Sequence, residues 1–458
     1  MLCRARCLRL AAPHRIKSSS RFLCAAPPPS PKDAKKESIQ NNESPPTKDD
    51  SLQLSSEAKL QLSILLGSSF VIQAAVGMII PVLPLFAQDV GLGSSGVGLI
   101  VAMPAAAKLA LNLPVGHLVD TVGRRKPLVY GCVIDGIGSL LTAASSNLTQ
   151  MAPARLLVGA GSSLGSTAGG AYLMDVVAQY PQHVGKLLGT AHAVGALGFA
   201  AGPMLGGLLA ERGGAALPFV LIGSVLIASG PVFSLLPETK PPSAPAAAAA
   251  SNGGARLGDA LSSAVDSFRV LLKDERQVAL CFMTFHLLAG WSVSLTTIPL
   301  HATATWGATP GQLGQIYSVV TLCGLLSAPI AGYLTDRIGR RPLVACGGLA
   351  TALSIACFPL VGQNEAAYYG LMGVWALGET FMMTATTALA ADVTAPEQRG
   401  AATSLRAQVG DLTFMVMPVM LGLIATSHSH AAAFGVTSVC GLGATAAFWR
   451  LTTSSKVR

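Results

Sequence analysis

Charged residues are scarce in this 458-residue sequence. Asp, Glu, Lys and Arg make up 12% of it, whereas soluble domains average about 25%. Aromatic residues are also few, at 5%, while hydrophobic residues reach 51%. A chain this apolar is not an ordinary soluble enzyme, and its composition predicts a protein embedded in a lipid bilayer.

The sequence also lacks the side-chain pairs from which catalytic and metal sites are built. Its nine cysteines are scattered singly, three near the N-terminus and six inside apolar runs. There is no CxxC pair, no Cys/His spacing suited to zinc and no nucleophile–base pair. We therefore expect no disulfide framework, no metal, no cofactor and no enzymatic activity.

Residues 1–59 differ from the rest of the chain. Up to Lys36 they contain nine basic residues and one acid, Asp33, with Ser, Ala and Pro between them. An Arg- and Ser-rich segment without a long apolar core resembles an organellar transit peptide more than a secretory signal. The alternative is a disordered cytoplasmic tail. A transit peptide would place the protein in a plastid or mitochondrial membrane, and the sequence does not separate the two. A cytoplasmic tail would instead fit the plasma or vacuolar membrane.

Twelve apolar stretches follow Leu60, each near the ~20 residues that a helix needs to cross a bilayer. We predict transmembrane helices at about 62–86, 96–116, 127–146, 150–178, 186–210, 215–236, 277–300, 311–332, 342–361, 366–391, 402–425 and 431–450.

A break between the sixth and seventh stretches divides the helices into six and six. It begins as the linker PETKPPSAPAAAAASNGG and ends in RLGDALSSAVDSFRVLLKDER, an amphipathic pattern typical of a surface helix. The predicted organisation after the N-terminal segment is therefore a six-helix bundle over 60–236, a linker over 237–276, a second bundle over 277–452 and a tail over 453–458.

The net charge of +9 reflects topology rather than a nucleic-acid partner. Of the 20 Lys and Arg after Lys59, 16 lie in loops and the tail on the side of the N-terminus, and only Arg212 lies in a loop on the opposite side. The positive-inside rule then places both termini on the cytoplasm-like face, or on the stroma- or matrix-like face in an organelle. We expect the protein to interact with the lipid bilayer and to be monomeric.

The two halves of the sequence repeat each other. The stretch GHLVDTVGRRKPL begins at Gly116, and GYLTDRIGRRPL begins 216 residues later at Gly332. Three more pairs are 215 residues apart: Pro84 with Pro299, Gly185 with Gly400, and Pro203 with Pro418. Duplicated halves indicate a transporter with pseudo-twofold symmetry and a site between them at the midplane. The predicted fold class is all-α and integral to the membrane, with two related six-helix bundles.

The repeated stretch resembles the signature loop between helices 2 and 3 of the major facilitator superfamily. In that family it acts as a conformational latch, with close helix approach expected at Gly116 and ion pairing at Asp120. Thr121 departs from the usual Arg, which the second copy keeps as Arg337. The resemblance implies a latch formed by Gly116, Asp120, Gly123, Arg124, Arg125, Gly332, Asp336, Gly339 and Arg340.

The fifth predicted helix matches the family's antiporter signature, G-x8-G-x3-G-P-x2-G-G, at each fixed position: Gly189, Gly198, Gly202, Pro203, Gly206 and Gly207. Three of these glycines are four residues apart, which predicts a groove for a partner helix. Of this signature, only Pro418 and Gly422 remain in the second half. The resemblance is to the drug/metabolite:proton antiporters (tetracycline and multidrug exporter-like), and it implies export.

Ionisable side chains inside predicted spans are the candidates for proton and substrate binding. Each costs about 2.5–3.5 kcal/mol at the centre of a helix in lipid, so we expect them to face a wet cavity or each other. The candidates are Lys108, Asp135, Arg155, Glu379, Arg406 and Asp411, with His286 (and, more weakly, His192) beside them. The resemblance implies proton transfer for Arg155, although Val158 replaces the Gln of the family's helix-4 motif.

Three of the six charged candidates are basic and three acidic, so the sequence does not choose between cationic and anionic substrates. Asp411 lies about 140° around its helix from Arg406, so the two should not pair. We expect a secondary transporter that moves a small organic solute by alternating access, with proton-coupled export. The alternatives are a uniporter or importer without proton coupling and a non-transporting membrane receptor or scaffold.

Overall fold

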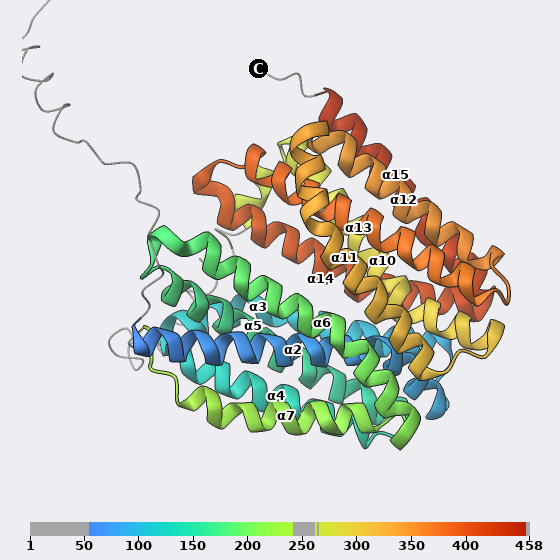
Figure 1. The fold of residues 1–458 in the computed structure, drawn as a ribbon, viewed down its shortest axis with the longest axis horizontal. Helices are drawn as coiled ribbons and strands as arrows, with labels where there is room; N and C mark the ends of the chain where they lie inside the picture. Colours follow the sequence, from blue (N-terminus) through green and yellow to red (C-terminus); the bar gives the residue numbers. More distant parts are fainter. Residues whose placement is uncertain (1–54, 241–261, 263–264, 455–458) are drawn as a thin grey trace, which may run out of the picture. The chain divides into compact units, whose positions relative to one another are not determined.

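The computed structural model describes residues 55–240, 262 and 265–454, so most of the expected transit peptide or tail lies outside the described residues. Within those ranges the chain has no strand and twelve long helices (Figure 1), and each predicted span coincides with one of them. They are α2 (Ser56–Asp89), α3 (Ser94–Val122), α4 (Arg125–Ala143), α5 (Leu148–Val177), α6 (Val184–Gly213), α7 (Leu217–Ser234), α10 (Glu275–Trp306), α11 (Pro310–Ile338), α12 (Arg340–Cys357), α13 (Glu365–Val393), α14 (Arg399–Ser427) and α15 (His430–Ser454).

Local chemistry sets several helix ends. Ser55 and Asn147 accept hydrogen bonds from the first backbone N–H groups of α2 and α5, and Thr309 forms a capping box with Gln312 at the start of α11. Gly123 and Gly339 end α3 and α11 with φ near 100°, which a residue with a side chain rarely adopts. The matched glycines explain why α3 and α11 end at the same place in the repeat.

Nine of the twelve helices are long and apolar enough to span a bilayer. The other three, α4, α5 and α13, carry the candidates Asp135, Arg155 and Glu379. A charge inside a membrane helix lowers its apolar character, and such charges are tolerated where they face the interior of the bundle.

Helix packing in one half repeats in the other. In the first bundle α2 packs on α6, α3 on α5, and α4 on both α5 and α7. The corresponding helices of the second bundle form the same pairs: α10 with α14, α11 with α13, and α12 with both α13 and α15. Between the halves, α3 packs along α14 and α6 packs along α11, and we call these two interfaces the seams. The pseudo-twofold axis that relates the halves also relates one seam to the other. This is the pseudo-twofold arrangement that the internal repeat predicts.

The two seams meet at matched glycines and prolines. A Cβ on Gly98 of α3 would overlap the Pro418 carbonyl of α14, and one on Gly422 would overlap Ser94. In the other seam a Cβ on Gly314 of α11 would overlap the carbonyl of Pro203. Small residues let helix backbones touch, so these glycines fix how closely the halves can approach.

The segment before α10 is helical over residues 265–271. Leu271 is buried against Ala402 and Leu405 of α14, and Phe268 packs beside it. The apolar face of the predicted amphipathic helix therefore contacts protein at this end, whereas most of its earlier residues lie outside the described ones.

Candidate functional site: a cavity between the two halves

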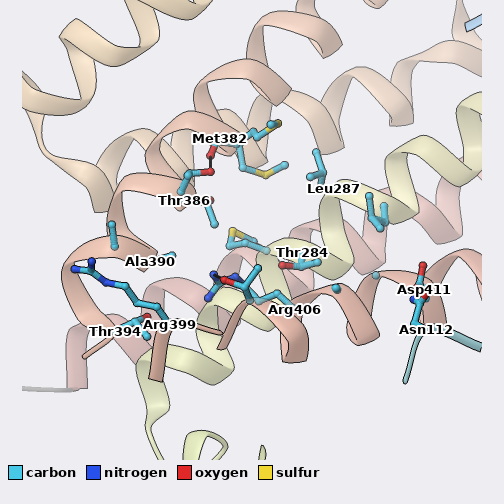
Figure 2. A pocket seen from close by; sticks show the side chains of 18 of the residues that line it. Asn112, Thr284, Leu287, Met382, Thr386, Ala390, Thr394, Arg399, Arg406 and Asp411 are labelled. Carbon is cyan, nitrogen blue, oxygen red and sulfur yellow. Dashed lines mark hydrogen bonds between the residues drawn. The ribbon is translucent and has the colours of Figure 1, made fainter. Parts of the chain in front are cut away.

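A cavity of about 1130 Å³ lies between the two bundles. Its walls come from α3 and α5 of the first half and from α10, α13 and α14 of the second. Threonines and methionines make up much of the lining, as for Thr284, Met382 and Thr386 (Figure 2). Such a surface suits a small organic molecule with both apolar and hydrogen-bonding parts.

In the part of the chain that the structure describes, the lining of the cavity reaches one face of the molecule. We define the terminal side as the face where α2 begins and α15 ends, and the far side as the opposite face. The lining includes Thr394 at the terminal-side end of α13 and Arg399, the exposed first residue of α14. On the far side the glycine seams hold the halves together, so the structure is open toward the terminal side.

Polar contacts reinforce the far-side closure. The Glu211 carboxylate at the end of α6 accepts a hydrogen bond from the Gly311 backbone N–H at the start of α11, at 3.0 Å. In the other seam the Ser95 N–H donates to the Thr426 hydroxyl at 3.1 Å. A carboxylate at a helix N-terminus is favourable, so Glu211 contributes to keeping this side shut.

Asp411 lies in the cavity and is held by the opposite half of the protein. Its Oδ2 atom accepts a hydrogen bond from Asn112 Nδ2 at 2.7 Å, and Ser163 donates to the Asn112 side-chain oxygen at 2.7 Å. Ser163, Asn112 and Asp411 come from α5, α3 and α14, so this polar chain crosses between the halves. Asp411 and Arg406 do not form an ion pair, in agreement with their spacing.

Three cations line the same cavity: Lys108, Arg399 and Arg406. In Figure 2 Arg399 lies toward one end, Asp411 and Asn112 lie toward the other, and Arg406 lies between them. The sequence analysis did not select Arg399, because the predicted span began at residue 402 and its charge counted as a loop charge. The observed helix begins at Arg399, and this shift brings it into the lining.

Two of the remaining candidates interact within the first half. Arg155 is 5% exposed, and its Nε and Nη1 atoms have no hydrogen-bond partner among the described residues. Asp135 lies near enough for its negative charge to attract Arg155, where Gly161 of α5 packs directly on the Asp135 backbone. Neither residue lines the cavity, and the two do not lie within ion-pair distance of each other. That these buried charges face each other stays a prediction.

Glu379 and His286 lie behind the cavity wall in the second half, around a gap too small for a water molecule. Trp291 Nε1 donates to Glu379 Oε1 at 2.6 Å. His286 is 2% exposed, and its two ring nitrogens contact the hydroxyls of Thr351 at 3.0 Å and Thr445 at 3.2 Å. Because Leu287 lines both spaces, this polar cluster is one side chain away from the cavity.

The latch residues form an ion-pair cluster at the terminal side. Arg124 Nη1 donates to Asp120 Oδ1 at 2.8 Å, and Arg124 Nε donates to Asp175 Oδ2 at 3.3 Å. Burial disfavours the charged guanidinium, but the hydrogen bonds to Asp120 and Asp175 outweigh this and raise the pKa of Arg124. The Glu238 carboxylate accepts from the backbone N–H groups of Arg124 and Arg125 and fills the space beside Gly123.

The second copy repeats this cluster. Arg340 lies 3.7 Å from Asp336 and 2.8 Å from Asp392. Sequence analysis missed Asp175 and Asp392. A signal was present, because each is followed by Val in the last turn of the fourth helix of its half, and the two are 217 residues apart. Each of these ion pairs lies within one half, so a latch between the halves remains a proposal.

Two expectations about the latch were wrong. Gly116 was expected to permit close helix approach, but a Cβ there would meet nothing within 4 Å. The stretch was also expected to be a loop, whereas α3 continues through Val122 and most of the motif is helical. Thr121 bonds only to carbonyls of its own helix, His117 and Leu118, in the described structure.

The glycine groove of α6 is present and has two faces. Gly198, Gly202 and Gly206 lie against the backbone of α2, at Phe70, Ala74 and Met78. On the other face, Pro203 and Gly207 touch α11 of the opposite half. The two signature residues that remain in the second half, Pro418 and Gly422, are those that touch α3. The repeat thus preserves the face that joins the halves, while Gly189 has open space around it.

Comparisons with known proteins agree with this architecture. The Major Facilitator Superfamily model matches residues 65–285 and 280–458. The human synaptic vesicular amine transporter is 26% identical over 278 residues, which are 60% of this chain and 50% of that protein. Multidrug resistance protein 2 of Bacillus subtilis is 24% identical over 324 residues, 66% of this chain and 77% of that one. The chain thus aligns with about half the length of the amine transporter.

Among solved structures, a bacterial homologue of the human lysosomal transporter Spinster superimposes with a TM-score of 0.73. The superposition covers 88% of this chain and 98% of that chain, at 13% sequence identity. At this identity the similarity shows the fold alone.

Proposed function

The chain belongs to the major facilitator superfamily, and we propose that it exports a small organic solute in exchange for protons by alternating access. It is a multi-pass integral membrane protein and not an enzyme. The observation that carries the proposal is the central cavity, which is open to the terminal side, closed on the far side and holds the Asp411 carboxylate. Solute would enter from the terminal side, and the halves would then rock to open the far side.

Asp411 is the proposed coupling group. A carboxylate that is partly withdrawn from water can carry a proton when neutral and release it when charged. Asn112 donates to Asp411 from the other half, so a change of charge on this carboxylate acts directly on the contact between the halves. A proton bound at Asp411 and a solute in the cavity would then favour different conformations, as exchange requires.

Transport by purified protein in sealed liposomes with an imposed pH gradient tests this proposal. Wild-type protein should accumulate a substrate from a panel of labelled organic compounds, and a protonophore should abolish the accumulation. Asp411→Asn should lose gradient-driven accumulation, while Asp89→Asn, which removes an exposed far-side carboxylate, should not. Equilibration of solute that ignores the gradient in the wild type would instead support the uniporter alternative.

We further propose that the two ion-pair clusters act as latches when the terminal side closes. The Asp120 and Asp336 side chains are 62% and 78% exposed in this open state, which leaves their carboxylates available to a partner from the other half. Removing the Asp120 charge by Asp120→Asn should slow transport without preventing insertion, whereas an unchanged rate would remove this residue from the proposal.

The proposed location is an organelle membrane, since residues 1–59 resemble a transit peptide in composition. A fusion of these residues to a fluorescent protein would enter plastids or mitochondria on this proposal. A diffuse cytosolic signal would favour the tail alternative.

A further inference from the structure

The cavity wall carries unequal charge. Among the described residues that line the cavity, Lys108, Arg399 and Arg406 are basic and Asp411 is the one acid, so this lining has a formal excess of positive charge. Asp135 and Glu379, which balanced the charge count in the sequence, do not line the cavity. Packing thus separates the charges and leaves the cavity wall predominantly basic.

Arg406 has hydrogen-bonding capacity to spare. Its Nη2 atom makes one long contact with the Thr403 hydroxyl at 3.4 Å, and its Nη1 atom is buried with no partner in the described part of the chain. The Thr386 hydroxyl, also in the lining, is likewise buried and unpartnered in these ranges. A buried donor without an acceptor is unfavourable, so both groups are suited to meet oxygen atoms of a ligand.

Asp411 does not neutralise this end of the cavity. It lies five residues beyond Arg406 on α14, which is about 7.5 Å further along the helix axis and about 140° around it. Asn112 already engages its carboxylate, and the positive charge of Lys108 also acts on it. Arg399 and Arg406 have no carboxylate within ion-pair distance in the described structure.

We propose that the transported solute carries an acidic group, a carboxylate or phosphate, which binds to Arg406 and Arg399, while the other end of the solute faces Asp411 and Asn112. The planar guanidinium donates paired hydrogen bonds to such groups. This inference depends on the proposed function in one respect, namely that the solute passes through this cavity. Exchange with a proton stays at Asp411, at the opposite end of the cavity.

The positive-inside rule offers a competing explanation for Arg399, because this residue is exposed at the mouth of the cavity. It does not account for Arg406, which lies two turns deeper and has a buried nitrogen without a partner among the described residues. The experiments therefore centre on Arg406, with Lys273 as the matched control: an exposed terminal-side cation outside the lining.

The first experiment measures the electrostatic potential in the cavity. In a variant lacking the nine native cysteines, Thr284→Cys places one thiol in the lining. Its rate of reaction is compared for an anionic and a cationic methanethiosulfonate reagent, against Lys273→Cys as an exposed reference site. The anionic reagent should be relatively favoured in the cavity, and Arg406→Gln should reduce this preference by about fivefold.

A cavity that favours the cationic reagent, or that reacts with neither, would overturn the proposal. So would a preference that Arg406→Gln leaves unchanged. No pH gradient is involved, so this result is independent of whether transport is proton-coupled. If the cavity favours the anionic reagent but the protein shows no accumulation driven by a pH gradient, only the proton-exchange mechanism is refuted.

The second experiment compares binding of hexanoate, hexylammonium and 6-aminohexanoate to the protein in nanodiscs. The two carboxylates should bind more tightly than hexylammonium, and Arg406→Gln should weaken them by about tenfold, whereas Lys273→Gln should not. A lipid headgroup offers the same acidic chemistry, so the measurement is repeated with anionic lipid in the disc. Loss of hexanoate binding on adding that lipid would assign the site to a lipid headgroup and overturn the solute proposal. Tighter binding of hexylammonium than of the carboxylates would also overturn it.

Discussion

The far-side seam should respond to the addition of a single methyl group. In Gly422→Ala the new Cβ would overlap the Ser94 backbone of the opposite half. Backbone cannot rotate away as a side chain can, so the strain is relieved only when the seam opens. Overpacking of this kind costs about 1–3 kcal/mol, which should shift the conformational equilibrium toward the far-side-open state by roughly 5- to 150-fold.

Gly435→Ala is the matched control for this prediction. Both glycines lie in helices of the second half, and a Cβ on Gly435 would meet nothing within 4 Å. Replacing a helical glycine by alanine gains up to about 1 kcal/mol of helix propensity. That gain applies in both conformations, so it does not move the equilibrium, and the comparison isolates the clash.

Pulsed electron resonance between spin labels at Gln88 and Gln363 measures this equilibrium. Both residues are exposed on the far side, one in each half. Gly422→Ala should add a population with a longer distance between the labels, and Gly435→Ala should leave the distribution as in the wild type. An identical distribution in all three proteins would refute the argument that backbone contact at this seam holds the far side closed.

Three smaller predictions follow from the packing. Gly198→Ala should lower the melting temperature, since its Cβ would overlap the Phe70 backbone. Gly116→Ala should not, because a Cβ there meets nothing within 4 Å, and equal melting temperatures would contradict this packing. Asp175→Asn should destabilise the protein by about 1 kcal/mol through Arg124, while Asp266→Asn should cost less, because that pair is exposed on both sides. Trp291→Phe removes the hydrogen bond to Glu379 and should lower the melting temperature more than Trp449→Phe does, because Trp449 is 45% exposed.

Much of the fold follows from the sequence because the bilayer imposes a fixed length on each apolar run. The twelve spans, the six-and-six division and the pseudo-twofold repeat were all predictable from that length and from the constant offset. The glycine groove was predictable too, since residues four apart share one face of a helix. Helix ends were less certain: α3 runs six residues beyond the predicted end at Gly116 because no breaker occurs before Gly123.

The site depends on information that the sequence does not contain. At a given depth a side chain on a helix can face lipid, a neighbouring helix or the cavity, and only the rotation and packing of that helix decide which. Asp135 and Arg155 lie outside the cavity lining, Glu379 accepts a hydrogen bond from Trp291, and Asp411 accepts one from Asn112 across the halves. The sequence by itself determined which residues carry charge within the membrane; the tertiary structure decided which of them share the cavity, and therefore its sign.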